Sequence, residues 1–143
     1  GWERPMTEDQ GTARVLLYSD DRAVREQVRL ALGKRVAADL PELEVFEVAT
    51  QPAVLQAMDA GGIDLAILDG EAVPSGGMGL CYQLKNEIED CPPVLLLVAR
   101  VADAWLATWS KADAIAAHPL DPVKLPTTVA ELLRARPSAE ATA

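Results

Sequence analysis

Acidic residues stand where apolar segments end, and the chain's single histidine stands at another such place. Asp20 and Asp21 follow the segment VLLY, Asp69 closes the segment IDLAILD, and Glu71 comes two residues later. One imidazole together with carboxylates is a ligand set that suits transition metals. One candidate metal site therefore comprises Asp20, Asp69, Glu71 and His118. The alternative is a histidine that simply packs in a loop. A single histidine offers no basis for a Ser-His-Asp catalytic set.

Five apolar segments position these residues and are predicted to be β-strands: residues 15–18, 44–49, 63–69, 92–99 and 114–117. A segment with the apolar spacing of a helix follows each of them. Alternating strands and helices predict a parallel sheet with helices on both faces. In such folds, sites form at the carboxyl ends of the strands. We therefore expect one crevice to collect Asp20, Asp69, Val98 and His118.

Length and composition indicate a single domain. The 143 residues suit one core, over residues 14–135, with flexible tails over 1–13 and 136–143. The net charge of −9 argues against binding to the nucleic-acid backbone, which requires Lys and Arg. The longest apolar run, VLLLVA, is far shorter than the roughly 20 residues that span a bilayer. Two cysteines and no signal segment predict a cytoplasmic protein without direct membrane insertion.

Four segments, in this order, resemble the receiver domain of two-component response regulators: VLLYSDD, GIDLAILDGE, CPPVLLLVAR and HPLDP. The resemblance covers roughly residues 14–135. It implies a flavodoxin-like α/β fold, (βα)5, with a parallel five-stranded sheet of order 2-1-3-4-5. It also implies a signalling domain rather than an enzyme.

The resemblance places the family's phosphorylation chemistry on an acidic pocket. The phospho-accepting aspartate falls on Asp69, and the acidic pair that binds Mg²⁺ falls on Ser19 and Asp20, with Asp21 and Glu71 beside them. Because Ser19 removes one negative charge from the metal site, only weak Mg²⁺ binding by Asp20 and Asp69 is expected, and no cofactor is required.

The positions that transmit phosphorylation in the family differ here. The switch Ser/Thr falls on Val98, the switch aromatic residue on Ile115, and the lysine on His118. Valine cannot hydrogen-bond a phosphoryl oxygen, and a histidine is a shorter, only partial replacement for an ammonium. The sequence therefore predicts that the switch is lost.

Trp105 and Trp109 are spaced to share one face of the helix that precedes the last strand. In receivers, that helix, the fifth strand and the fifth helix form a dimerisation or output surface. Since Trp is enriched at binding hot spots, the pair is a candidate interface. The alternative is that one tryptophan packs over the core and the other covers it.

These observations favour a stand-alone, atypical receiver that binds a protein partner constitutively. The details also resemble orphan receivers associated with respiratory NADH dehydrogenase (complex I), which implies an accessory role at the cytoplasmic side of the membrane. A conventional single-domain regulator phosphorylated at Asp69 is the main alternative. A small enzyme or ligand-binding flavodoxin-like protein is a further one.

Overall fold

Strands and helices alternate along the whole of the chain that the computed structural model describes, residues 11–73 and 76–135. The strands are β1 (Thr12–Tyr18), β2 (Glu42–Val48), β3 (Leu65–Asp69), β4 (Val94–Val98) and β5 (Ala114–Ala117). The helices are α2 (Arg22–Leu32), α3 (Gln51–Ala60), α4 (Gly77–Glu87), α5 (Trp105–Ser110) and α6 (Lys124–Ala135), with a 3₁₀ turn, η1 (Val101–Asp103), before α5.

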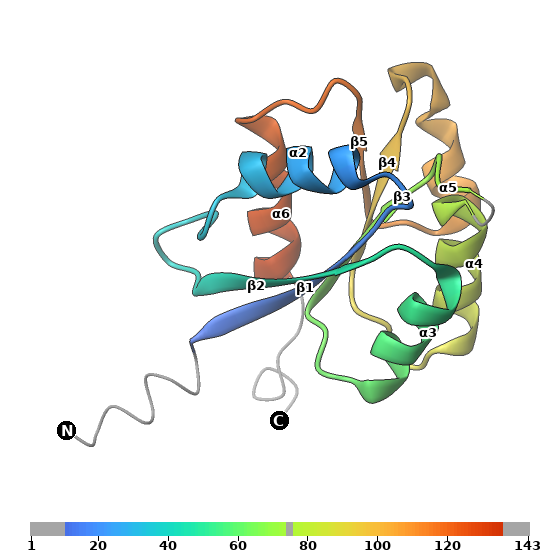
Figure 1. The fold of residues 1–143 in the computed structure, drawn as a ribbon, viewed down its shortest axis with the longest axis horizontal. Coiled ribbons are helices and arrows are strands. Elements are labelled where there is room, and N and C mark those ends of the chain that lie inside the picture. Colours follow the sequence, from blue (N-terminus) through green and yellow to red (C-terminus); the bar gives the residue numbers. More distant parts are fainter. Residues whose placement is uncertain (1–10, 74–75, 136–143) are drawn as a thin grey trace.

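All strand pairings are parallel, and the sheet order is β2-β1-β3-β4-β5. Helices α2 and α6 cover one face of the sheet, and α3, α4 and α5 cover the other (Figure 1). This confirms the predicted flavodoxin-like fold. The central strands β3 and β4 are buried at every position because both of their faces are covered.

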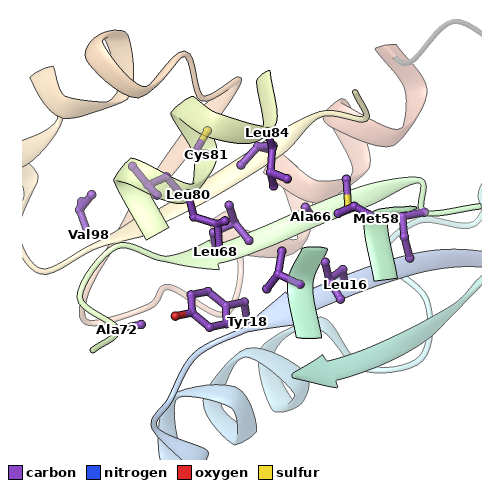
Figure 2. Close-up of a cluster of buried hydrophobic side chains, with 14 residues drawn as sticks. Leu16, Tyr18, Met58, Ala66, Leu68, Ala72, Leu80, Cys81, Leu84 and Val98 are labelled. Atoms are coloured by element: carbon purple, nitrogen blue, oxygen red, sulfur yellow. The ribbon is translucent and has the colours of Figure 1, made fainter. Parts of the chain in front are cut away.

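Two apolar clusters hold the layers together, one on each face of the sheet. On the α2–α6 face, side chains from β1, β3 and β4 meet Val28, Leu32, Leu125 and Val129. On the other face, Figure 2 shows Leu16 and Tyr18 of β1 with Leu68 of β3 and helix residues such as Leu80 and Leu84. The parallel sheet is thereby fixed in place, with its carboxyl-end loops at a single edge.

The ends of the helices follow local rules. The Asp21 side chain accepts a hydrogen bond from the Ala23 amide at 2.9 Å and caps α2, and Thr50 caps α3. Near the C-terminus, α6 begins at Lys124, and the Asp121 side chain accepts hydrogen bonds from the amides of Val123 and Lys124. Helix α5 is short, with six residues, and follows the 3₁₀ turn η1.

The edges of the domain differ slightly from the prediction. Strand β1 starts at Thr12, two residues before the predicted boundary at residue 14. The predicted C-terminal tail, 136–143, and most of the N-terminal one lie outside the described residues. None of the helices in the described ranges has the length and apolar character needed to cross a membrane.

The long connection between α2 and β2 is tied to the domain by an ion pair. Arg134 donates from Nε to Asp39 Oδ2 at 2.8 Å and from Nη2 to Asp39 Oδ1 at 2.6 Å. This fork geometry connects the loop to the last helix, which lies far away in sequence. The loop is therefore a fixed part of the α2–α6 side.

Candidate functional site

The carboxyl edge of the sheet brings together the loops that follow β1, β3, β4 and β5. Ser19 follows β1 directly, and Asp69 is the last residue of β3. The amide of His118, after β5, donates to the carbonyl oxygen of Val98 at 3.0 Å. The expected convergence of these strand ends on one edge is thus present in the fold.

A buried hydrogen bond joins Ser19 and Asp69 at the centre of this edge. The Ser19 hydroxyl donates to Asp69 Oδ2 at 2.7 Å, and the Glu71 amide donates to Asp69 Oδ1 at 2.8 Å. Ser19 is fully buried and Asp69 is only 3 % exposed. The Ser19 hydroxyl also accepts from the Asp21 amide at 3.0 Å. Both oxygens of the Asp69 carboxylate therefore already have donors from the protein itself.

The other acidic residues of the pocket face solvent and stabilise the loops around it. Asp20 accepts a hydrogen bond from the Val73 amide at 3.2 Å, which connects the loop after β1 to the loop after β3. Asp21 caps α2 as described above, and Glu71 contributes its backbone amide to Asp69. Asp20, Asp21 and Glu71 are all exposed. The buried centre of the pocket is thus the hydrogen bond between the Ser19 hydroxyl and the Asp69 carboxylate.

This donor set fits a metal ion poorly. Mg²⁺ prefers carboxylate and water oxygens in octahedral geometry, whereas here both Asp69 oxygens and one Asp20 oxygen accept amide or hydroxyl hydrogens. Within the described residues, no three His, Cys, Asp or Glu side chains are arranged to hold a metal ion. The transition-metal site predicted from His118, Asp20, Asp69 and Glu71 is therefore wrong: the shared edge does not bring these side chains into a ligand cluster.

The three positions expected to be degenerate lie around this pocket or in the core beside it. Val98 is fully buried at the end of β4. Ile115 lies opposite Leu96 in the sheet and packs against the α3–α4 cluster. His118 is half-buried, and the peptide bond to Pro119 is cis. Two of the three side chains are aliphatic and can only pack.

Glycines allow the next helix to start directly on the pocket. A Cβ atom on Gly77 would lie 2.6 Å from the carbonyl oxygen of Asp69, and one on Gly70 would lie 2.7 Å from that of Leu97. The described part of the loop SGGMG, from Gly76 on, leads straight into α4. Gly77 is needed for this close backbone packing, whereas a Cβ on Gly79 would meet nothing within 4 Å.

Two residues at the site were not predicted from the sequence. Arg25 of α2 donates from Nη1 to the carbonyl oxygen of Ser19 at 2.7 Å and from Nε to Glu47 at 3.0 Å, so it fixes the loop after β1. Tyr18, the last residue of β1, points its hydroxyl toward Ala72 in Figure 2. Burial, and then the nearby Asp20 and Asp69 carboxylates, raise the pKa of Tyr18. Nothing in the spacing of Arg25 along α2 indicates these contacts.

The predicted tryptophan pair is exposed on α5. Trp105 and Trp109 are 66 % and 53 % exposed. The Trp109 ring packs on Tyr82 of α4, with ring centroids 5.0 Å apart. Helix α5 contacts α4 far more than it contacts β5 or α6. Neither tryptophan is buried over the core, and Trp109 contacts the preceding helix.

Comparisons with known proteins agree on one group. No family model matches the chain. It is 58 % identical over 128 residues to a response regulatory protein of Mycobacterium tuberculosis, covering 89 % of this chain and 96 % of that protein. It is 30 % identical over 125 residues, 84 % of this chain, to the transcriptional regulatory protein CseB of Streptomyces avermitilis, of which it covers 48 %.

Solved structures with low sequence identity share the fold. The receiver domain of the Francisella response regulator 1452 aligns with a TM-score of 0.72 at 16 % identity, over 85 % of this chain and 97 % of that one. The chemotaxis response regulator CheY4 of Vibrio cholerae aligns with a TM-score of 0.69 at 18 % identity, over 85 % and 98 % of the two chains.

Proposed function

Because this chain belongs to the response-regulator family and has its receiver fold, we propose that it acts by constitutive protein–protein binding that does not depend on phosphorylation. The observation that carries this proposal is the buried hydrogen bond from Ser19 to Asp69. The resemblance places the first member of the family's Mg²⁺-binding acidic pair on Ser19, so this hydrogen bond lies where that pair would face the phospho-accepting carboxylate.

Phosphorylation would act against this arrangement. In that reaction an Asp69 oxygen attacks the phosphorus of a donor, the donor's leaving group departs, and the new acyl phosphate brings about two negative charges. Those charges would enter a pocket bordered by Asp20 and Glu71, with Val98 where a hydroxyl would be needed. Breaking the 2.7 Å bond from Ser19 would also leave a buried hydroxyl without its acceptor.

Treatment with acetyl phosphate and Mg²⁺, followed by intact mass measurement, tests the chemistry. We expect no stoichiometric phosphoryl transfer to the protein. Neither the wild type nor Asp69→Asn should gain the mass of a phosphoryl group. Amide spectra recorded with beryllofluoride and Mg²⁺ test the switch, and the loops after β4 and β5 should keep their signals. Asp69-dependent phosphorylation with loop movement would instead support the conventional single-domain regulator.

The partner is the second part of the proposal. We infer a protein partner, with the chain as a non-enzymatic accessory subunit that requires no cofactor and binds Mg²⁺ weakly at most. The resemblance to orphan receivers associated with complex I makes respiratory NADH dehydrogenase the first candidate, and places the chain at the cytoplasmic side of the membrane. Support for this candidate comes from the sequence resemblance alone.

Isolation of complex I from the host tests this candidate. The tagged chain and its Asp69→Asn variant should be recovered with the isolated enzyme in equal amounts, because the carboxylate is not a switch. Recovery of neither chain would reject this partner without affecting the phosphorylation result.

Absence of a thermal shift with flavin, nucleotides and divalent metals would argue against the ligand-binding alternative.

A further inference from the structure

The charged residues of this protein are distributed unevenly over the fold. Residues 22–41 and 118–135, which form α2, α6 and the loops beside them, carry seven Lys or Arg and four Asp or Glu. We call this part of the molecule the basic side. The other described residues carry four Lys or Arg and fourteen Asp or Glu. The basic side therefore has an excess of positive charge on a chain whose net charge is −9.

Most of the unpaired positive charge is also on the basic side. Arg25 and Arg29 share one carboxylate, that of Glu47, with both ion pairs at 3.0 Å. Six cations have no ion pair within the described residues, and four of these six are exposed on this side: Arg22, Lys34, Arg35 and Lys124. Charges farther apart than about 8 Å are largely screened at physiological ionic strength. A partner on this side therefore meets the local positive excess rather than the net charge of the chain.

An apolar groove lies on the basic side, between α2 and the loop that joins β5 to α6 (Figure 1). Its volume is about 420 Å³, and its lining residues are Gln27, Leu30, Ala31, Pro119, Leu120 and Pro122. All of them except Gln27 are apolar. Leu30 is 77 % exposed, and Val123, which follows the groove in sequence, is 73 % exposed. Apolar surface left uncovered around a concave site is typical of a site that takes a partner's side chain.

Cations adjoin the residues that line both walls of this groove. Lys34 comes two residues after the end of α2, and Lys124 is the first residue of α6, two residues beyond Pro122. Lys124 does not serve the helix, because the helix dipole disfavours a cation in the first turn. The nearest carboxylates in sequence are those of Glu26 and Asp121, fewer than the four unpaired cations. The groove is thus an apolar centre with a cationic rim, which is complementary to an apolar side chain flanked by carboxylates.

We propose that the basic side binds an acidic segment of the protein partner, which places an apolar side chain in the groove and carboxylates against Lys34 and Lys124. This inference rests on the proposed function, since it locates the surface that the constitutive partner contacts. A bilayer of anionic lipids would supply the negative charge but no side chain for the groove. The acidic part of a second copy would make a head-to-tail contact, which builds open chains of copies unless the rotation closes a ring.

Selection from a random linear peptide library displayed on phage, with the full chain as target, tests the proposal. We expect the selected peptides to carry Asp or Glu on either side of Leu, Ile, Phe or Trp. The tightest peptide, titrated into isotope-labelled protein, should shift the amides of Leu30, Ala31 and Leu120. Its affinity should fall at least about fivefold between about 50 and about 300 mM salt, because exposed charge pairs are screened.

Matched variants separate the basic side from the other exposed surfaces. Lys124→Glu should weaken peptide binding at least about fivefold and leave the fold intact, because an acidic residue suits the first turn of a helix. Lys111→Glu makes the same change of charge at an exposed lysine outside the basic side, and should leave the affinity within about twofold. Leu30→Ala should weaken binding about tenfold. Val101→Ala, at a residue that is 76 % exposed outside the basic side, should not.

The proposal is wrong if no peptide is selected, if the selected peptides are basic or uncharged, or if the shifts lie outside the groove. It is also wrong if Lys111→Glu weakens binding as much as Lys124→Glu does. Sedimentation with phosphatidylglycerol vesicles that Lys124→Glu abolishes would assign the basic side to a membrane instead, and self-association that it abolishes would assign it to a second copy. None of these results changes the reaction of Asp69 with acetyl phosphate, so they are distinguishable from failure of the proposed function.

Discussion

Replacing Ser19 by alanine removes the hydroxyl that donates to Asp69 and changes little else in shape. Asp69 is 3 % exposed, so water cannot readily take the place of the lost donor. A hydrogen bond to a charged group is worth about 1.5–3 kcal/mol, and a buried acceptor left without a partner is costly. The Glu71 amide remains on the other carboxylate oxygen. We therefore expect Ser19→Ala to lower the free energy of unfolding by about 2–3 kcal/mol.

Urea unfolding at neutral pH, followed by circular dichroism, measures this loss. The slope of the unfolding free energy against urea concentration should stay the same, because the substitution does not alter the surface that unfolding exposes. Asp69→Ala and the double variant complete a mutant cycle. The coupling energy between the two positions should be about 2 kcal/mol. If the two single changes add without coupling, the hydrogen bond does not stabilise the pocket, and the central argument for a ligand-independent site fails.

Ser19→Asp tests the same contact by placing a second negative charge beside Asp69. Two carboxylates about 4 Å apart repel by about 4 kcal/mol at an effective dielectric constant of 20, so this variant should be the least stable one without metal. Mg²⁺ should recover part of the loss, about 2.7 kcal/mol at a concentration one hundred times its dissociation constant. The wild-type protein should gain much less from Mg²⁺. Equal stabilisation of both proteins would contradict the poor fit of the native pocket to this ion.

Three further predictions concern other parts of the fold. Gly77→Ala should destabilise the protein because its Cβ would lie 2.6 Å from a backbone carbonyl at the end of β3. Gly79 has open space around it, so Gly79→Ala should stabilise α4 by about 0.5–1 kcal/mol. Thermal unfolding of both variants tests these two expectations. The hydrogen-bonded ion pair with Arg134 lowers the pKa of Asp39 below its usual 3.8. The ion pair therefore stabilises the fold at neutral pH, and this stabilisation is lost as the pH falls below 3.8 through the lowered pKa. In urea unfolding, Asp39→Asn should be less stable than the wild type at neutral pH and equal to it in strong acid. Burial raises the pKa of the Cys81 thiol to about 11, so about one thiol in a thousand is ionised near pH 8. Cys81 should therefore react with a thiol reagent only as fast as the protein unfolds. Rapid labelling of Cys81 would contradict its burial.

The fold was predictable because its signals are local. Strands β3 and β4 are buried on both faces and therefore appear in the sequence as continuous apolar runs. Their alternation with helical segments requires a parallel sheet, and a parallel sheet places the strand ends at one edge. Boundaries were less predictable: the short 3₁₀ turn η1 precedes α5, and no single residue in Val101–Asp103 marks it.

The site was predictable only as a set of residues. The sequence indicated that Ser19 removes a charge from the acidic pocket, but the hydrogen bond to Asp69 joins residues 50 positions apart and depends on the register of β1 and β3. The metal cluster around His118 was wrong for a related reason, since sharing one edge of a sheet does not bring side chains within ligand distance. The packing of Trp109 on Tyr82 likewise depends on how α4 and α5 meet.

A receiver that signals must have two arrangements of its loops that differ little in free energy, and a ligand that favours one of them. Here the loop after β1 is held by Asp69 through the Ser19 hydroxyl and by Arg25 through the Ser19 carbonyl. Arg25 is in turn paired with Glu47 of β2. Each of these contacts stabilises the same arrangement, and none needs a phosphoryl group or a metal ion. Under the constitutive binding that we propose, a protein partner meets a single, preformed conformation and no activating step is required.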